Sequence, residues 1–269
     1  MYTLLVTDLD DTLYNWIDFF IPSFVAMAEE VSAITHIPMP TLLAEYKMVH
    51  HKEQNVESPY ATLQLPSVRA CFWGEDELAV KRKLQPAFDA YNRKRDTTLV
   101  LYEGVNSTLK ALKEQGVAIV GYTEAAKENG WYRLEKLGVS CYFDRLYVPR
   151  ATTPIQPHEP VHIATERKPS PATLLRICSE MGKAPSEVLY VGDSLTKDVY
   201  MAKQAGVKVA QMLRSQPPKE HIDMLVAITS WTEADFLAEA ERKEKVAKLG
   251  IKADYIVSNY SQLLPLFLG

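Results

Sequence analysis

The amino-acid sequence predicts an α/β protein, with a mostly parallel sheet covered by helices on both faces and an inserted all-helical block. A junction in which a helical stretch ends at a glycine and continues into a β-branched residue occurs at Gly116, Gly138, Gly206 and Gly250. Glycine ends helices in a left-handed conformation, and the apolar residues that follow suit a buried strand. Repeated alternation of helix and strand is typical of a parallel sheet.

The helical block extends from Trp16 to about Arg95. Apolar residues recur at helical spacing over residues 16–35, 41–52, 58–72 and 75–95, with Pro66 and Pro86 predicting breaks in the last two stretches. A strand that precedes this block cannot bury both its faces alone, so we assign it to the alternating part. We therefore predict a core domain of residues 1–14 and 97–269 and a helical cap domain of residues 15–96.

Two stretches interrupt the alternation. Residues 149–167 contain four prolines, which predict a long loop. His158 and His162 have helical spacing within it, but without a helix they are expected to be loop residues and not a metal-binding pair. Residues 215–248 are expected to contain a turn at Pro217-Pro218 and a charged helix from Glu233 to Lys248.

Composition excludes several classes of function. Thirty Lys and Arg against 34 Asp and Glu give a net charge of −4, which argues against a general nucleic-acid or acidic-membrane surface. No apolar run approaches the length of a membrane span and no secretion signal is apparent, so a cytoplasmic protein is expected. Three widely spaced cysteines predict neither disulfides nor a zinc site, and we expect them to be buried small hydrophobic residues.

The apolar run from Leu4 to Val6 leads directly into Asp8, Asp10 and Asp11. If this run is a central strand, Asp8 lies at its carboxyl end, where open α/β sheets bind ligands. Asp8 and Asp10 would repel each other unless a cation or a proton intervened. The alternative is a turn in which the aspartates accept hydrogen bonds from backbone N–H groups. Taken alone, the stretch leaves both interpretations open.

Three later junctions carry polar groups of the same kind. Gly192 and Asp193 follow an apolar strand, with Asp198 five positions beyond Asp193, and these oxygen donors suit Mg²⁺. Thr123 and Glu124 end another strand, where a hydroxyl precedes backbone N–H groups. Lys168 precedes a helix that begins with proline, and its cation would bridge an anionic ligand and the carboxylates.

In this order, the set of Asp8, Asp10, Thr12, Thr123, Lys168, Asp193 and Asp198 resembles the four signature motifs of the haloacid dehalogenase superfamily. The alternating core over residues 1–14 and 97–269 resembles the Rossmann-like domain of that superfamily. The helical block between the first and second motifs resembles its C1-type cap.

The resemblance implies a role for each residue. Asp8 would take the phosphoryl group as an aspartyl phosphate, and Asp10 would protonate the leaving oxygen and then deprotonate water. Thr123, Glu124 and nearby N–H groups would bind the phosphoryl group, and Lys168 would neutralise charge. Mg²⁺ would be held by Asp8, the backbone carbonyl of Asp10, and Asp193, with Asp198 as a weaker or water-mediated ligand. We expect Asp11 only to shape the turn.

We therefore expect a Mg²⁺-dependent phosphomonoester hydrolase. Dehalogenases of this superfamily lack the second aspartate, whereas Asp10 suits an alkoxide leaving group. The alternatives are a phosphotransferase or mutase of the same superfamily, and a phospho-ligand-binding protein without turnover.

The expected substrate is a small soluble phosphorylated metabolite, because a cap so close to the nucleophile would close over a small molecule. By type and position, Tyr14, Lys47 and Arg69 are candidate substrate-lining residues. His50 and its neighbours His51 and Lys52 are expected on a solvated face of the cap.

Overall fold

The computed structural model describes residues 1–53, 55–215, 217–229, 231 and 233–268. It divides into two compact units, a sheet unit of residues 1–15, 100–215 and 239–269 and a helical unit of residues 16–99 and 216–238. The units differ from the domains expected from the sequence in one main respect, because residues 216–238 group with the helices of residues 16–99. The chain therefore passes between the units four times, after residues 15, 99, 215 and 238.

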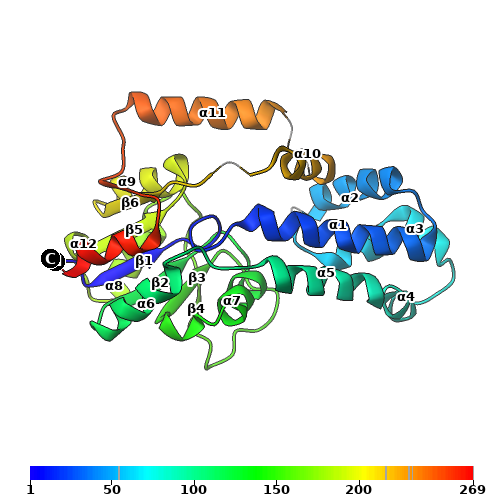
Figure 1. Cartoon of the computed structure of the whole chain (residues 1–269), viewed down its shortest axis with the longest axis horizontal. Helices are drawn as coiled ribbons and strands as arrows, with labels where there is room; N and C mark the ends of the chain where they lie inside the picture. The colour runs from blue at the N-terminus through cyan, green and yellow to red at the C-terminus, as the bar shows by residue number, and fades with distance from the viewer. Residues whose placement is uncertain (54, 216, 230, 232, 269) are drawn as a thin grey trace. The chain divides into compact units, whose positions relative to one another are not determined.

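The sheet unit is built on seven parallel strands in the order β4-β3-β2-β1-β5-β6-β7, which confirms the predicted fold class. Strand β1, which carries the acidic stretch, is central and lies between β2 and β5 (Figure 1). The strands are β1 (Leu4–Thr7), β2 (Ala118–Tyr122), β3 (Arg145–Val148), β4 (Val161–Ile163), β5 (Val188–Gly192), β6 (Lys208–Met212) and β7 (Tyr255–Val257).

Helices cover both faces of this sheet (Figure 1). On one face, Leu4 and Val6 of β1 join a buried apolar cluster to which α8 (Ala172–Glu180) and α9 (Tyr200–Gln204) contribute. Thr7 points to the opposite face, as alternation along a strand requires, and there its hydroxyl accepts a hydrogen bond from Tyr260. On that face α6 (Val105–Glu114) contacts β2 and α12 (Leu264–Leu268).

The glycine junctions behave as expected at the helix ends. The φ angles of Gly116, Gly138, Gly206 and Gly250 lie between +69° and +76°, in the left-handed region. Strands β2 and β6 begin two residues after Gly116 and Gly206, but β3 and β7 begin only at Arg145 and Tyr255. Several residues lie between the glycine and the strand at these two junctions, and those before β3 include a 3-10 helix (Ser140–Tyr142).

The helical unit consists of α1 (Trp16–Thr35), α2 (Met39–Glu53), a 3-10 helix (Pro59–Gln64), α3 (Pro66–Cys71), α4 (Glu77–Lys83), α5 (Gln85–Thr98) and α10 (Lys219–Ile228). Pro66 and Pro86 lie in the first turns of α3 and α5, so the two predicted breaks are observed. Helix α1 packs against α5, and α10 packs against α2 and α1.

The two irregular stretches contain more structure than the sequence predicted. Residues 161–163 form edge strand β4, so the expectation that His162 is a loop residue is wrong; its ring stacks on Tyr147 at 5.1 Å. A strand of three residues directly after Pro160 has too little pattern to detect. Helix α10 was also missed, whereas the charged helix α11 (Glu233–Lys248) was predicted correctly.

Of the three cysteines, Cys178 is buried, but Cys71 and Cys141 are exposed, so the expectation of burial is wrong for both. All three are free thiols. Within the described part of the chain, every helix is too short or too polar to cross a membrane.

Candidate active site

The carboxyl ends of the central strands bring three aspartates together. Asp8 directly follows β1 and Asp193 directly follows β5, while Asp198 lies in the short π-helix Leu195–Val199 that comes after β5. One carboxylate oxygen of each lies within 4.8 Å of the other two. Residues separated by 185 positions in the sequence meet here because β1 and β5 are neighbours in the sheet.

Lys168 joins two of these carboxylates. Its Nζ lies 2.7 Å from Oδ1 of Asp8 and 2.8 Å from Oδ1 of Asp198. It also lies over the rings of Tyr122 and Tyr190, at 5.1 and 5.5 Å from their centroids. Burial alone would lower the pKa of Lys168, but the carboxylates of Asp198 and Asp8 outweigh it and raise the pKa. Lys168 is therefore a fixed cation beside Asp8.

The cluster carries more negative than positive charge. Burial raises the pKa of Asp8 well above its usual value, Lys168 opposes this shift, and the other two carboxylates add to it. Burial, then repulsion from Asp198 and Asp11, raises the pKa of Asp193 to about 7. Three ionised carboxylates and one ammonium would leave a net charge of −2. Oxygen donors with this excess charge fit a hard divalent cation such as Mg²⁺.

Asp198 is held by three donors. Its Oδ1 accepts from Lys168 and from the hydroxyl of Tyr190 at 2.7 Å, and its Oδ2 accepts from the backbone N–H of Ser194 at 3.1 Å. Gly192 makes room for this carboxylate, since a Cβ at that position would lie 2.4 Å from Cγ of Asp198. Asp198 is therefore suited to orient Lys168 and is less open to a metal than Asp193.

Thr123 and Glu124 lie at the carboxyl end of β2. Thr123 is fully buried, and its Oγ1 accepts from the backbone N–H of Ala125 at 3.0 Å. Glu124 accepts from Nε of Arg167 at 2.8 Å and from the backbone N–H of Lys168 at 3.2 Å. The carboxylate of Glu124 thus holds the segment that carries Lys168, and a role in binding substrate stays a prediction.

Asp10 faces a different partner from Asp8. Its Oδ1 lies 2.8 Å from Nη1 of Arg133, a buried residue of α7 (Lys127–Lys136). The guanidinium of Arg133 lies 5.9 Å from the ring of Tyr14, and Tyr14 is itself fully buried. Tyr14 was predicted to line the substrate site, but its side chain has no exposed surface in this structure.

Arg133 was not identified from the sequence. The buried positions of α7 are Lys127, Gly130, Arg133 and Leu134. A cation on the buried face of a helix needs a carboxylate partner from another element. The sequence does not show which carboxylate that is.

The turn after Asp10 has a second arginine that the sequence did not reveal. Asp11 has φ of 56°, so it occupies the left-handed conformation of a tight turn. Arg214 donates from Nε to the carbonyl of Asp11 at 3.1 Å and from Nη2 to the carbonyl of Thr12 at 2.6 Å. Its guanidinium stacks 3.5 Å from the ring centroid of Tyr102. Burial lowers the pKa of Arg214 from its usual value.

Lys47 and Arg69, the predicted lining residues of the helical unit, bind backbone carbonyls there. Lys47 donates to the carbonyl of Val226 at 3.1 Å, and Nδ1 of the buried His50 donates to the carbonyl of Ile228 at 2.8 Å. Both carbonyls belong to the last turn of α10, whose carbonyls have no partners within the helix. The expectation that His50 lies on a solvated face is therefore wrong.

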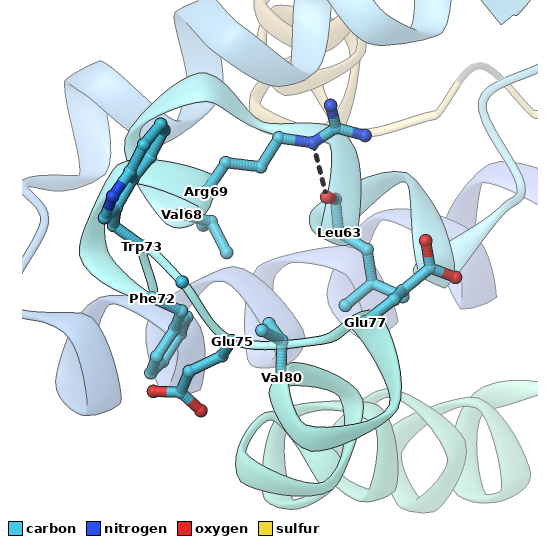
Figure 2. Close-up of a pocket in the computed structure, with 9 residues that line it drawn as sticks. Leu63, Val68, Arg69, Phe72, Trp73, Glu75, Glu77 and Val80 are labelled. Atoms are coloured by element: carbon cyan, nitrogen blue, oxygen red, sulfur yellow. Dashed lines mark hydrogen bonds between the residues drawn. The ribbon is translucent and has the colours of Figure 1, made fainter.

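Arg69 lies on α3 and lines a pocket of about 270 Å³ (Figure 2). Its Nε donates to the carbonyl of Leu63 at 3.1 Å across the rim of the pocket. The other walls are apolar, aromatic and acidic side chains on the same unit, including Phe72, Trp73 and Glu75. Lys47 is not among the residues that line this pocket.

Comparison with known proteins identifies similar chains. A family model described as haloacid dehalogenase-like hydrolase matches residues 5–212. The probable phosphoglycolate phosphatase of Pseudomonas putida is 29% identical over 192 residues, which cover 65% of this chain and 71% of that protein. The phosphoglycolate phosphatase of Nitrosococcus oceani is 31% identical over 165 residues, covering 58% of this chain and 68% of that protein.

Solved structures show the same fold. The crystal structure of a 2-haloacid dehalogenase from Pseudomonas syringae pv. Tomato DC3000 matches with a TM-score of 0.55 and 17% identity, covering 100% of this chain and 99% of that chain. At this identity the likeness concerns the fold alone.

Proposed function

This chain belongs to the haloacid dehalogenase-like hydrolases and is a phosphatase of that family, and from this premise we propose that it hydrolyses a small phosphate monoester with Mg²⁺ through a phosphorylated Asp8. The observation that carries the proposal is the pairing of Asp8 with Lys168. A carboxylate at the carboxyl end of the central strand has a buried ammonium at 2.7 Å and a second carboxylate, Asp193, within metal-binding reach.

The chain's own groups divide the work of the first step. Asp8 attacks phosphorus, so that a bond forms to its carboxylate oxygen while the bond from phosphorus to the leaving oxygen breaks. Lys168 keeps a positive charge beside the attacking oxygen, and Thr123 presents a hydroxyl at the next strand end. Asp10 supplies a proton to the leaving oxygen, a contribution of about 10²–10⁴-fold in rate.

The residues present fit Mg²⁺. Asp8, Asp193 and the backbone carbonyl of Asp10 would hold the ion, and Asp198 would orient Lys168 beside it. The ion would offset the repulsion between the phosphate and the carboxylates. Without it, the raised pKa of Asp193, about 7, keeps this carboxyl partly protonated at neutral pH.

A small metabolite is the substrate class that the comparisons support. The two relatives described above are named as phosphatases of phosphoglycolate. The glyceraldehyde 3-phosphate phosphatase of Methanopyrus kandleri is 28% identical over 127 residues, which cover 47% of this chain and 49% of that protein. We therefore propose a small phosphorylated metabolite, and we include these two esters in the test.

The test measures inorganic phosphate released from 2-phosphoglycolate, glyceraldehyde 3-phosphate and 4-nitrophenyl phosphate, with and without Mg²⁺. We expect release that requires Mg²⁺ and falls by at least about 10³-fold in Asp8→Asn. The matched control is Asp254→Asn, because Asp254 also pairs with lysines in the sheet unit but directly precedes β7, at the opposite edge of the sheet. Phosphate release from none of these esters, or unchanged turnover in Asp8→Asn, would refute the proposal.

A further inference from the structure

We infer that Arg133, supported by Tyr14, is a positioning residue that orients the carboxyl group of Asp10 for proton transfer. The inference rests on the proposed function, because it assigns Asp10 to the proton steps of phosphoester hydrolysis. It adds an arginine from a helix whose own sequence gives no sign of a role in the reaction.

The contact is short and shielded from water. Nη1 of Arg133 lies 2.8 Å from Oδ1 of Asp10, and the two side chains are 4% and 25% exposed. A charge-assisted hydrogen bond from a buried guanidinium fixes the direction of a carboxylate more strongly than a bond at the surface does.

The guanidinium of Arg133 packs on an aromatic ring. Tyr14 packs beneath its guanidinium, 5.9 Å from the ring centroid, and the side chain of Tyr14 is fully buried. The backbone of Tyr14 forms a bridge with that of Asp10, which closes the turn between them. Asp10 and Tyr14, the two residues that contact Arg133, therefore belong to one turn, and Arg133 reaches this turn from α7.

Helix α7 connects this turn to the predicted phosphate-binding strand end. It begins at Lys127, four residues after Thr123, and Gly130 lies against the methyl group of Thr123. A Cβ at Gly130 would lie 3.4 Å from Cγ2 of Thr123 and 3.8 Å from Cδ2 of Leu9, so the helix backbone is close to both. One turn later, α7 presents Arg133 to Asp10. Helix α7 thus contacts both Thr123 and Asp10 and links their positions.

Asp10 would transfer a proton in each of the two steps, and a badly oriented Asp10 would slow both transfers. In the first step the bond from phosphorus to the leaving oxygen breaks, and Asp10 gives its proton to that oxygen. In the second step Asp10 takes a proton from water as the water oxygen bonds to phosphorus and the bond to Asp8 breaks. Arg133 transfers no proton and acts only through the orientation of Asp10.

The test uses leaving groups of different basicity, because an alkoxide needs the proton more than a nitrophenolate does. We would measure single-turnover release of the leaving group from 2-phosphoglycolate and 4-nitrophenyl phosphate in Arg133→Met and Arg133→Lys. We expect Arg133→Met to slow the alkyl ester by about 10–100-fold and the aryl ester by only about 2–5-fold, with KM from separate steady-state measurements changed by less than about 3-fold. Arg133→Lys should recover part of the loss.

Arg145→Met is the matched control, since Arg145 pairs with Glu180 in the same unit but away from Asp10. We expect this variant to slow both esters equally or not at all. Thermal unfolding of each variant establishes that it is folded, and Arg133→Lys keeps the test valid if Arg133→Met does not fold.

Equal losses on the two esters, or no loss in either Arg133 variant, would overturn the inference. The variants Asp8→Asn and Asp10→Asn distinguish failure of the inference about Arg133 from failure of the proposed function. If Asp8→Asn abolishes turnover and Asp10→Asn reproduces the preference for the aryl ester, the proposed function stands whatever Arg133 does. If Asp8→Asn turns over normally, the proposed function itself fails.

Discussion

Replacing Tyr190 by phenylalanine tests how Lys168 is held beside Asp8. The hydroxyl of Tyr190 donates to Oδ1 of Asp198 at 2.7 Å, and the same oxygen accepts from Lys168 at 2.8 Å. The change removes one donor and leaves the ring, which lies 5.5 Å from Nζ of Lys168, in place. Asp198 then keeps only Lys168 on that oxygen and gains freedom to rotate.

The expected magnitude follows from burial and charge. A hydrogen bond to a charged group contributes about 1.5–3 kcal/mol, and Tyr190 is fully buried, so solvent cannot replace the lost donor. Because Lys168 still binds the same oxygen, we expect the lower end, about 1.5 kcal/mol, in the free energy of unfolding. We expect kcat to fall about 10-fold, because a small displacement of Lys168 weakens its contact with Asp8.

Urea unfolding, with EDTA and with Mg²⁺, measures the change in stability, and steady-state phosphatase kinetics with Mg²⁺ measure the change in kcat. The control is Tyr147→Phe, which removes a hydroxyl that donates to Glu180 at 2.5 Å, outside the aspartate cluster. Tyr147→Phe should lower stability without changing kcat. The reasoning is refuted if the two variants lose the same activity, or if Tyr190→Phe keeps both the stability and the kcat of the parent protein.

Three other changes have definite expected outcomes. Gly192→Ala puts a Cβ 2.4 Å from Cγ of Asp198, and the carboxylate of Asp198 must therefore move by about 1 Å. We expect kcat to fall about 100-fold in a protein that circular dichroism shows to be folded. Arg214→Ala removes the donors to two carbonyls of the turn at Asp11. We expect faster amide hydrogen exchange in residues 9–13 and a kcat about 10-fold lower. Unchanged hydrogen exchange would contradict this role of Arg214. Burial lowers the pKa of His50, so below its ordinary pKa of about 6.5 the unfolded chain binds more protons than the folded one, and stability falls as pH falls. The difference in unfolding free energy between pH 7.5 and pH 5.0 should therefore be smaller in His50→Gln than in the parent protein, and an equal difference would contradict this account.

The sheet was predictable because its signals are local. The run from Leu4 to Val6 is apolar, and a strand buried on both faces by helices requires such a run. Glycines with positive φ end the helices, and each of them shows where the chain turns from a helix toward the next strand. Strand β4 had neither an apolar run nor a preceding glycine. Three residues at the edge of a sheet need little apolar content, and the strand directly follows Pro160, which is typical of a loop.

The residues at the strand ends were predictable for a related reason. In a parallel sheet all carboxyl ends lie at one edge, so Asp8, Thr123 and Asp193 were expected together as soon as the strands were recognised. Their partners were not predictable. Arg133 and Arg214 reach the acidic turn from segments more than a hundred residues away, and only the packing of those segments brings them there.

Lys47 in the helical unit shows what residue type alone does not determine. Lys47 was a candidate substrate ligand because it is a cation in a cap, yet it binds the carbonyl of Val226 at the end of α10. Partnerless carbonyls at a helix end attract cations and N–H donors as strongly as many ligands do. Whether Lys47 binds a ligand or a helix end depends on whether α10 packs beside it. Helix α10 comes from a segment far along the chain that was expected to belong to the core.

Three of the four connections between the two units are bound, within the sheet unit, to the turn after Asp10. The backbone N–H of Tyr102 donates to the carbonyl of Leu13 at 2.8 Å, which ties the chain entering the helical unit to the chain returning from it. Arg214, just before the third passage, donates to the carbonyls of Asp11 and Thr12 and stacks on Tyr102. Three connections are thus bound to one turn of backbone. Because Asp8 and Asp10 immediately precede this turn, the network that organises the connections also fixes the two carboxylates assigned to the reaction.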